Sequence, residues 1–133
     1  MKVVLDTHIW LTWLLDPSRL AVRERRALDT LAEARNLALP AICMWEAQML
    51  HAKRRIEVPF GFASWLRRAT APDIVTILPI DVGTVISIDE LPNRFHGDPA
   101  DRIIVATARA HDLSLATHDT NIRKSRLVRI WKP

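Results

Sequence analysis

Carboxylates occur in this chain at points where apolar segments end or helices begin. Asp6 directly follows the apolar run VVL, Asp119 follows a second such run by a few residues, and Asp101 comes just after the pair Asp98-Pro99. Four carboxylates brought together repel one another and raise each other's pKa unless a cation lies among them. Oxygen ligands without a cysteine or histidine cluster favour Mg²⁺ or Mn²⁺ over zinc. We therefore predict a site for metal-assisted hydrolysis that consists of Asp6, Glu46, Asp101 and Asp119.

Glu46 carries the most information of the four acids. At 100° per residue it falls on the apolar face of a predicted helix, and an isolated carboxylate there is costly unless a cation, a donor or a metal accompanies it. The alternative is a structural ion pair with one of the many arginines. The expected apolar arc contains Ile42, Trp45, Met49, Leu50 and the stem of Lys53.

Helix capping is the alternative explanation for the aspartates. Asp6 could cap the helix behind it, although Thr7 could do so equally well. Asp98 before Pro99 is a strong helix-start signal, which explains Asp98 without a ligand role. Asp101 would gain from the helix dipole even if it bound nothing. The convergence of all four acids therefore favours the metal site over capping alone.

The elements that must position these acids alternate between strands and helices. Alternation of this kind predicts a three-layer α/β/α domain with a mostly parallel sheet of four to five strands. In such sheets ligands bind beyond the carboxyl ends of the strands, where Asp6 and Asp119 are expected. Strands are predicted at residues 2–5, 37–39, 74–78 and 113–116, with a possible fifth at 127–131; helices at 7–15, 41–54, 60–70, 81–90 and 99–111, and one from the N-cap Ser18 to about residue 35.

Length and composition favour one ordinary globular domain over residues 1–133. The single cysteine excludes an internal disulfide, and the start MKVVLDTHIW has no signal-peptide pattern, so we expect a cytoplasmic protein without a membrane span. The net charge of +4 suits a polyanionic partner. Three glycines exclude a glycine-rich phosphate loop. The tail adds cations and no acid after Asp119: Arg123, Lys124, Arg126, Arg129 and Lys132.

Three segments together resemble the PIN-domain family, and most closely the VapC-type toxins of prokaryotic toxin–antitoxin pairs. They are MKVVLDTHIWLTWLL, ICMWE and GDPADRIIVATARAHDLSLATHD, and the resemblance runs nearly end to end. It implies that Asp6, Glu46, Asp101 and Asp119 are the metal ligands. Thr117 matches a threonine that often accompanies the last acid.

The resemblance also implies a function and partners. It implies a Mg²⁺- or Mn²⁺-dependent endoribonuclease that hydrolyses RNA through a metal-activated water and leaves 5′-phosphate and 3′-hydroxyl ends. It implies a VapB-type antitoxin that covers the site, and a homodimer that antitoxins could join into a larger assembly. The choice of RNA over DNA rests on this resemblance alone.

The chain departs from the family pattern at two positions. Cys43 stands where a serine or threonine is usual, and Asp112 replaces a common glycine. Neither change removes a carboxylate. Several other polar or aromatic residues receive no catalytic role: Arg102 could contact a phosphate or a site acid, four of the five tryptophans lie at core spacing, and the histidines at 8, 51, 96, 111 and 118 show no ligand spacing.

Three other functions are compatible with parts of the pattern. A non-catalytic PIN-like module could bind RNA or protein, but such a module has no reason to keep four mutually repelling acids. An aspartyl-phosphate phosphatase needs a second aspartate two residues after Asp6, where His8 stands instead. A receiver domain needs a lysine after a late strand, which this sequence lacks.

Overall fold

A parallel four-stranded sheet forms the centre of the molecule. In the computed structural model, which describes residues 2–95 and 97–133, the strand order is β3-β2-β1-β4 and every pairing is parallel. The strands form because short apolar runs are buried between helices on both faces, as all-parallel sheets require. Val4 and Leu5 of β1 are fully buried. The strands are β1 (Val3–Leu5), β2 (Leu37–Pro40), β3 (Thr76–Leu78) and β4 (Ser114–Ala116).

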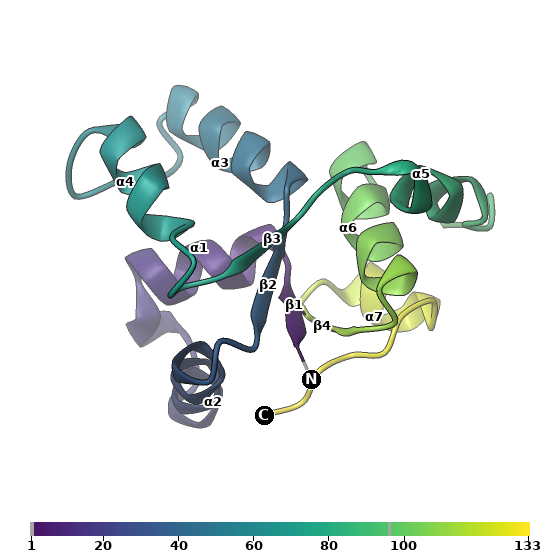
Figure 1. Cartoon of the computed structure of the whole chain (residues 1–133), viewed down its shortest axis with the longest axis horizontal. Coiled ribbons are helices and arrows are strands. Elements are labelled where there is room, and N and C mark those ends of the chain that lie inside the picture. Colours follow the sequence, from purple (N-terminus) through teal and green to yellow (C-terminus); the bar gives the residue numbers. More distant parts are fainter. Residues whose placement is uncertain (1, 96) are drawn as a thin grey trace.

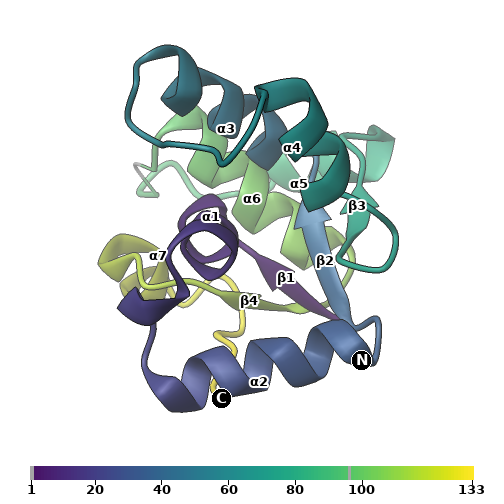
Figure 2. The same cartoon turned by 90° about the vertical axis from the view of Figure 1, so that its left-hand side faces the viewer.

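Helices cover both faces of this sheet, which confirms the predicted three-layer arrangement. Figures 1 and 2 show α1, α2 and α4 on one side of the strands and α5, α6 and α7 on the other. Besides a short 3₁₀ turn at Pro17–Arg19, the helices are α1 (Thr7–Leu15), α2 (Val22–Glu33), α3 (Ile42–Ala52), α4 (Phe62–Ala69), α5 (Val82–Asp89), α6 (Pro99–Ala110) and α7 (Thr120–Ser125).

The predicted fifth strand at residues 127–131 is wrong. This segment makes one isolated parallel bridge, between Leu115 and Ile130, with two backbone hydrogen bonds to Leu115. It covers the free edge of β4 without extending the sheet. Covering an edge in this way removes a surface that could pair with another chain.

Two helix boundaries also differ from the prediction. Ser18 does not cap α2: its hydroxyl donates to Asp16, and the chain makes a 3₁₀ turn that buries Leu20 before α2 begins. The helix α7 was not predicted, and its N-cap is Asp119. No helix in residues 2–95 or 97–133 is long and apolar enough to cross a membrane.

Candidate active site

All four predicted acids line one cleft of about 370 Å³ at the carboxyl ends of β1 and β4. The chain brings them there from four different elements, since Asp6 follows β1, Glu46 lies in α3, Asp101 lies in α6 and Asp119 precedes α7. The cleft is completed by Thr7, His8, Asp98, Ile104 and His118. No lysine or arginine is among these lining residues. The role of Asp6, Glu46, Asp101 and Asp119 as metal ligands stays a prediction.

Asp6 is the most constrained acid in the cleft. It is 5% exposed, and its Oδ1 accepts the Ile9 amide at 2.8 Å, so Asp6 and not Thr7 caps α1. Its Oδ2 accepts the hydroxyl of Thr117. Burial raises the pKa of Asp6, against the lowering effect of these two hydrogen bonds. Both oxygens are thus fixed in direction, while each keeps a lone pair for another ligand.

Glu46 enters the cleft half-buried and is oriented by Thr7. The Thr7 hydroxyl donates to Glu46 Oε1 and so fixes the direction of this carboxylate. Burial raises the pKa of Glu46, and the nearby charges of Asp98 and Asp6 raise it further. No ion pair with an arginine is found for Glu46 in the described part of the chain, so the structural alternative lacks its partner.

The side of α3 that packs against the core differs from the predicted apolar face. The fully buried side chains of this helix are Cys43 and Ala47, whereas Trp45 is 52% exposed. Burial raises the pKa of the Cys43 thiol well above its usual range, which keeps it protonated and inert. The sequence pattern misplaced the face because it weighed Trp45 as a core residue.

Asp98 and Asp101 stand together at the start of α6. Asp98 caps the helix, as predicted, by accepting the Asp101 amide at 2.7 Å. The Asp101 side chain is half-buried and its pKa is raised to about 6, first by burial and then by the charges of Asp98, Asp119, Glu46 and Asp6. The raised pKa of Asp101 is therefore the clearest sign that these carboxylates repel one another.

Thr117 joins the two aspartates that follow strands. Its hydroxyl donates to Asp6 Oδ2 and accepts the Asp119 amide at 3.0 Å. Asp119 Oδ1 accepts the Ile122 amide at 2.9 Å, which leaves Oδ2 for a ligand. Beside them, His118 Nε2 lies 2.8 Å from Glu24 Oε2 and connects this loop to α2. Thr7 and Thr117 orient the acids, and the sequence signalled only Thr117.

The chemistry of this donor set fits a hard divalent cation. The cleft gathers several carboxylates, which all carry negative charge when ionised, and three of them have a raised pKa. A divalent cation among them would relieve their repulsion. Across residues 2–95 and 97–133, no three acidic, histidine or cysteine side chains already surround a point where a metal ion fits.

Several residues that the sequence left open have structural roles. Arg102 makes no ion pair with a site acid in the described part of the chain. Its Nη1 donates instead to the Phe95 carbonyl at 2.8 Å. Trp10 and Trp65 are buried and their rings contact each other with centroids 5.7 Å apart. His96 lies outside the described residues.

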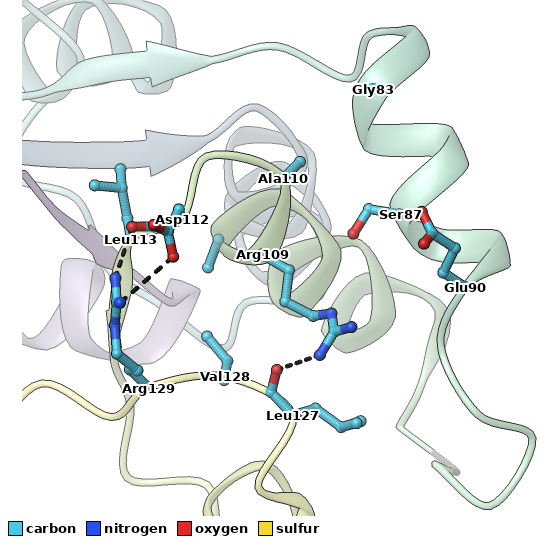
Figure 3. A pocket seen from close by; sticks show the side chains of 11 residues that line it. Gly83, Ser87, Glu90, Arg109, Ala110, Asp112, Leu113, Leu127, Val128 and Arg129 are labelled. Atoms are coloured by element: carbon cyan, nitrogen blue, oxygen red, sulfur yellow. Dashed lines mark hydrogen bonds and ion pairs between the residues drawn. The ribbon is translucent and has the colours of Figure 1, made fainter.

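A second cleft, of about 440 Å³, lies away from the acids between α5, the end of α6 and the C-terminal segment (Figure 3). Its two arginines are engaged with the protein. Arg109 Nη1 donates to the Leu127 carbonyl at 2.5 Å, and Arg129 contacts Asp112 through the carbonyl at 2.6 Å and a carboxylate oxygen at 3.4 Å (Figure 3). This cleft offers no comparable set of acids.

Thr117→Val should lower the maximal rate of catalysis at the acidic cleft by about 10- to 100-fold. Valine matches the shape of threonine but removes the hydroxyl that orients Asp6 and accepts the Asp119 amide, and loss of groups that orient metal ligands has effects of this size. Thr117→Ser should stay within a few-fold of wild type. The measurement is kcat at saturating substrate.

Thr107→Val is the matched control for this prediction. Thr107 is also buried, and its hydroxyl donates only to the Ile103 carbonyl within α6. Equal loss of rate in both valine variants would show that Thr117 acts through packing and not through Asp6.

Comparison with known proteins gives matches over nearly the whole chain. A family model described as the PIN domain matches residues 3–126. Ribonuclease VapC22 of Mycobacterium tuberculosis is 36% identical over 125 residues, which cover 93% of this chain and 92% of that protein.

Solved structures match the fold at lower sequence identity. VapBC2 from Rickettsia felis, bound to a DNA fragment from its promoter, has a TM-score of 0.74 at 15% identity and covers 98% of both chains. FitAcB from Neisseria gonorrhoeae has a TM-score of 0.68 at 22% identity and covers 98% of this chain and 96% of its own. These two likenesses concern the fold alone.

Proposed function

Because the chain belongs to the PIN-domain family, we propose that it is a Mg²⁺- or Mn²⁺-dependent endoribonuclease, the toxin of a VapBC-type toxin–antitoxin pair. The observation that carries the catalytic part is the convergence of Asp6, Glu46, Asp101 and Asp119 on one cleft. The likeness to a curated ribonuclease over most of both chains supports RNA as the substrate, and the cytoplasm is the place of action that we propose.

The four acids have distinct parts in this proposal. Asp6 is the fixed ligand, since α1 and Thr117 hold its two oxygens. Asp119 presents its free oxygen from the cap of α7, and Thr7 turns Glu46 toward the cleft. Asp101, whose pKa is raised to about 6, responds most to the charge of whatever enters the cleft.

A divalent cation held by these carboxylates would activate a water molecule for in-line attack on phosphorus and offset charge on the leaving oxygen. The protein contributes orientation: the fixed directions of Asp6 and Asp119 define where the phosphate must lie. In this proposal water attacks and the 3′ oxygen of the RNA is the leaving group, so the products would be a 5′-phosphate and a 3′-hydroxyl end, as the family resemblance implies.

A VapB-type antitoxin is the proposed protein partner, and a groove beside the acids is its proposed position. The groove has a volume of about 610 Å³ and combines apolar side chains, Leu15, Leu50 and Ile56, with charged ones, Asp16, Arg19, Arg55 and Glu57, which suits an amphipathic partner helix. His8 lines both this groove and the acidic cleft, so a bound partner would obstruct the RNA. Exposed apolar side chains on α5, at Val82, Val85 and Ile86, support a homodimer.

The test is cleavage of total cellular RNA by the purified protein with Mg²⁺ or Mn²⁺ and with EDTA. We expect discrete fragments with the metal ions and none with EDTA, and end mapping should find 5′-phosphates. Tight RNA binding without metal-dependent fragments would favour a non-catalytic binding module instead.

A further inference from the structure

A basic cleft opens beside the acidic one, between α7 and the segment before α6. It has a volume of about 250 Å³ and contains two cationic side chains from separate elements, Arg94 and Lys124. No acidic side chain lines it in the described part of the chain. Its other lining residues are Phe95, Asn121, Ser125 and Leu127.

Arg94 and Lys124 are exposed, and neither side chain has a partner in residues 2–95 and 97–133. The ion pairs in residues 2–95 and 97–133 are His118–Glu24 and Arg129–Asp112. Arg102 and Arg123 each donate to a backbone carbonyl, whereas neither Arg94 nor Lys124 makes a side-chain hydrogen bond there. Both are therefore available to a ligand.

On one side, a residue that lines the basic cleft lies close to a residue that lines the acidic cleft. A Cβ placed on Gly97 would lie 2.9 Å from Phe95 Cζ and 3.0 Å from Asp101 Cβ, so the Phe95 ring edge and Asp101 are no farther apart than the sum of these distances. Arg102, the residue after Asp101, holds the Phe95 carbonyl at 2.8 Å. The segment that carries Arg94 is thus attached to the start of α6.

The opposite wall is attached to the acids through α7. Asp119 caps this helix, and Asn121 and Lys124 lie in it two and five residues later. At 1.5 Å rise per residue, Lys124 is about 8 Å along the helix from Asp119. The two clefts are therefore neighbours. The hydrogen bond from Arg102 to the Phe95 carbonyl fixes one side of the basic cleft, and the Asp119 cap of α7 fixes the other.

We propose that the basic cleft is a subsite for RNA, in which Arg94 and Lys124 bind a backbone phosphate next to the one cleaved and Asn121 donates a further hydrogen bond. This inference rests on the proposed nuclease function. The acidic cleft itself has no lysine or arginine lining and repels a polyanion, so cations outside it must supply the attraction. The guanidinium of Arg94 suits the oxygens of a phosphate.

The test compares wild type with Arg94→Ala/Lys124→Ala by the binding of a fluorescein-labelled 12-nucleotide single-stranded RNA. Both proteins carry Asp101→Asn and are assayed in EDTA, so that no turnover occurs. Each lost phosphate contact should reduce the slope of log affinity against log salt by about 0.7. Because both cations bind the same phosphate, we expect the slope to fall by about 0.7 in the double variant, and affinity at 0.1 M salt to fall about tenfold.

The matched control is Arg67→Ala/Arg68→Ala, which removes two exposed cations from α4, on the far side of the sheet from α7 (Figure 1). It should keep the wild-type slope. The exchange variant Arg94→Lys/Lys124→Arg should also keep the slope, because the charges remain. Equal losses in the α4 control and the double alanine variant would overturn the subsite, since net charge alone would then explain the effect.

Cleavage by the protein without Asp101→Asn, measured in parallel with Mg²⁺, separates the two proposals. If that protein cuts RNA but Arg94→Ala/Lys124→Ala binds like wild type, the subsite is wrong and the nuclease function stands. If the protein without Asp101→Asn binds RNA but does not cut it, the nuclease function fails. The comparison of salt slopes between wild type and the double alanine variant then still shows whether the subsite binds RNA. A protein that neither binds nor cuts RNA contradicts both.

Discussion

Asp6→Asn is expected to reduce the rate of RNA cleavage by at least about a hundredfold. The change removes a charge from the most buried of the proposed metal ligands, and loss of a metal's charge stabilisation has effects of this order. The fold should survive, since the side-chain carbonyl oxygen of the introduced asparagine can still accept the Ile9 amide that caps α1. The measurement is the initial rate of fragment formation from total RNA with Mg²⁺.

Asp73→Asn is the control for this experiment, because it removes the same charge from an exposed position outside every cleft described above. It should cleave at the wild-type rate. Thermal unfolding of both variants checks that they are folded. If Asp6→Asn and wild type cut RNA at the same rate, the acidic cleft is not catalytic.

The sequence predicted those parts of the fold where a single local signal is strong. The apolar run of β1 ends at Asp6, and Asp98-Pro99 marks the start of α6, so both boundaries agree with the structure. The helix α7 was missed because six residues, TNIRKS, are too short to give an apolar period. Asp119 is also the N-cap of this helix, a role that the sequence does not separate from the predicted ligand role.

The grouping of the acids followed from a rule about parallel sheets, but their hydrogen bonds did not. The strand ends predicted that Asp6 and Asp119 would meet, and both line the same cleft. The contact of Thr7 with Glu46 joins residues 39 positions apart, and nothing in either local pattern indicates it. The basic cleft depends likewise on how the loop before α6 packs against α7, which is a tertiary contact without a sequence motif.

Asp101→Asn is expected to inactivate the enzyme and yet to stabilise the metal-free protein at pH 7. Burial and the neighbouring acids raise the pKa of Asp101 to about 6, from about 4 in an unfolded chain. Between these values the folded state binds a proton that the unfolded state does not, so stability falls as pH rises through this window. Asparagine has no such titration.

The difference should amount to about 1 kcal/mol at pH 7 after allowance for the partial exposure of Asp101, which corresponds to a rise of about 3–5 °C in Tm. Near pH 4 the two proteins should unfold at similar temperatures. The measurement is Tm in EDTA across pH 4 to 7. Adding Mg²⁺ should raise the Tm of wild type more than that of the variant, because the ion relieves a repulsion that the variant has lost.

Asp81→Asn provides the contrast, since the pKa of Asp81 is lowered by hydrogen bonds from Thr84 at the start of α5. A lowered pKa contributes stability that is present at neutral pH and lost as pH falls through it, the opposite sign to Asp101. Removing this charge should therefore leave Tm at pH 7 unchanged or slightly lower. A lower Tm for Asp101→Asn at pH 7 would mean that its carboxylate stabilises the metal-free fold, and the account of the cleft as a set of mutually repelling ligands would fail.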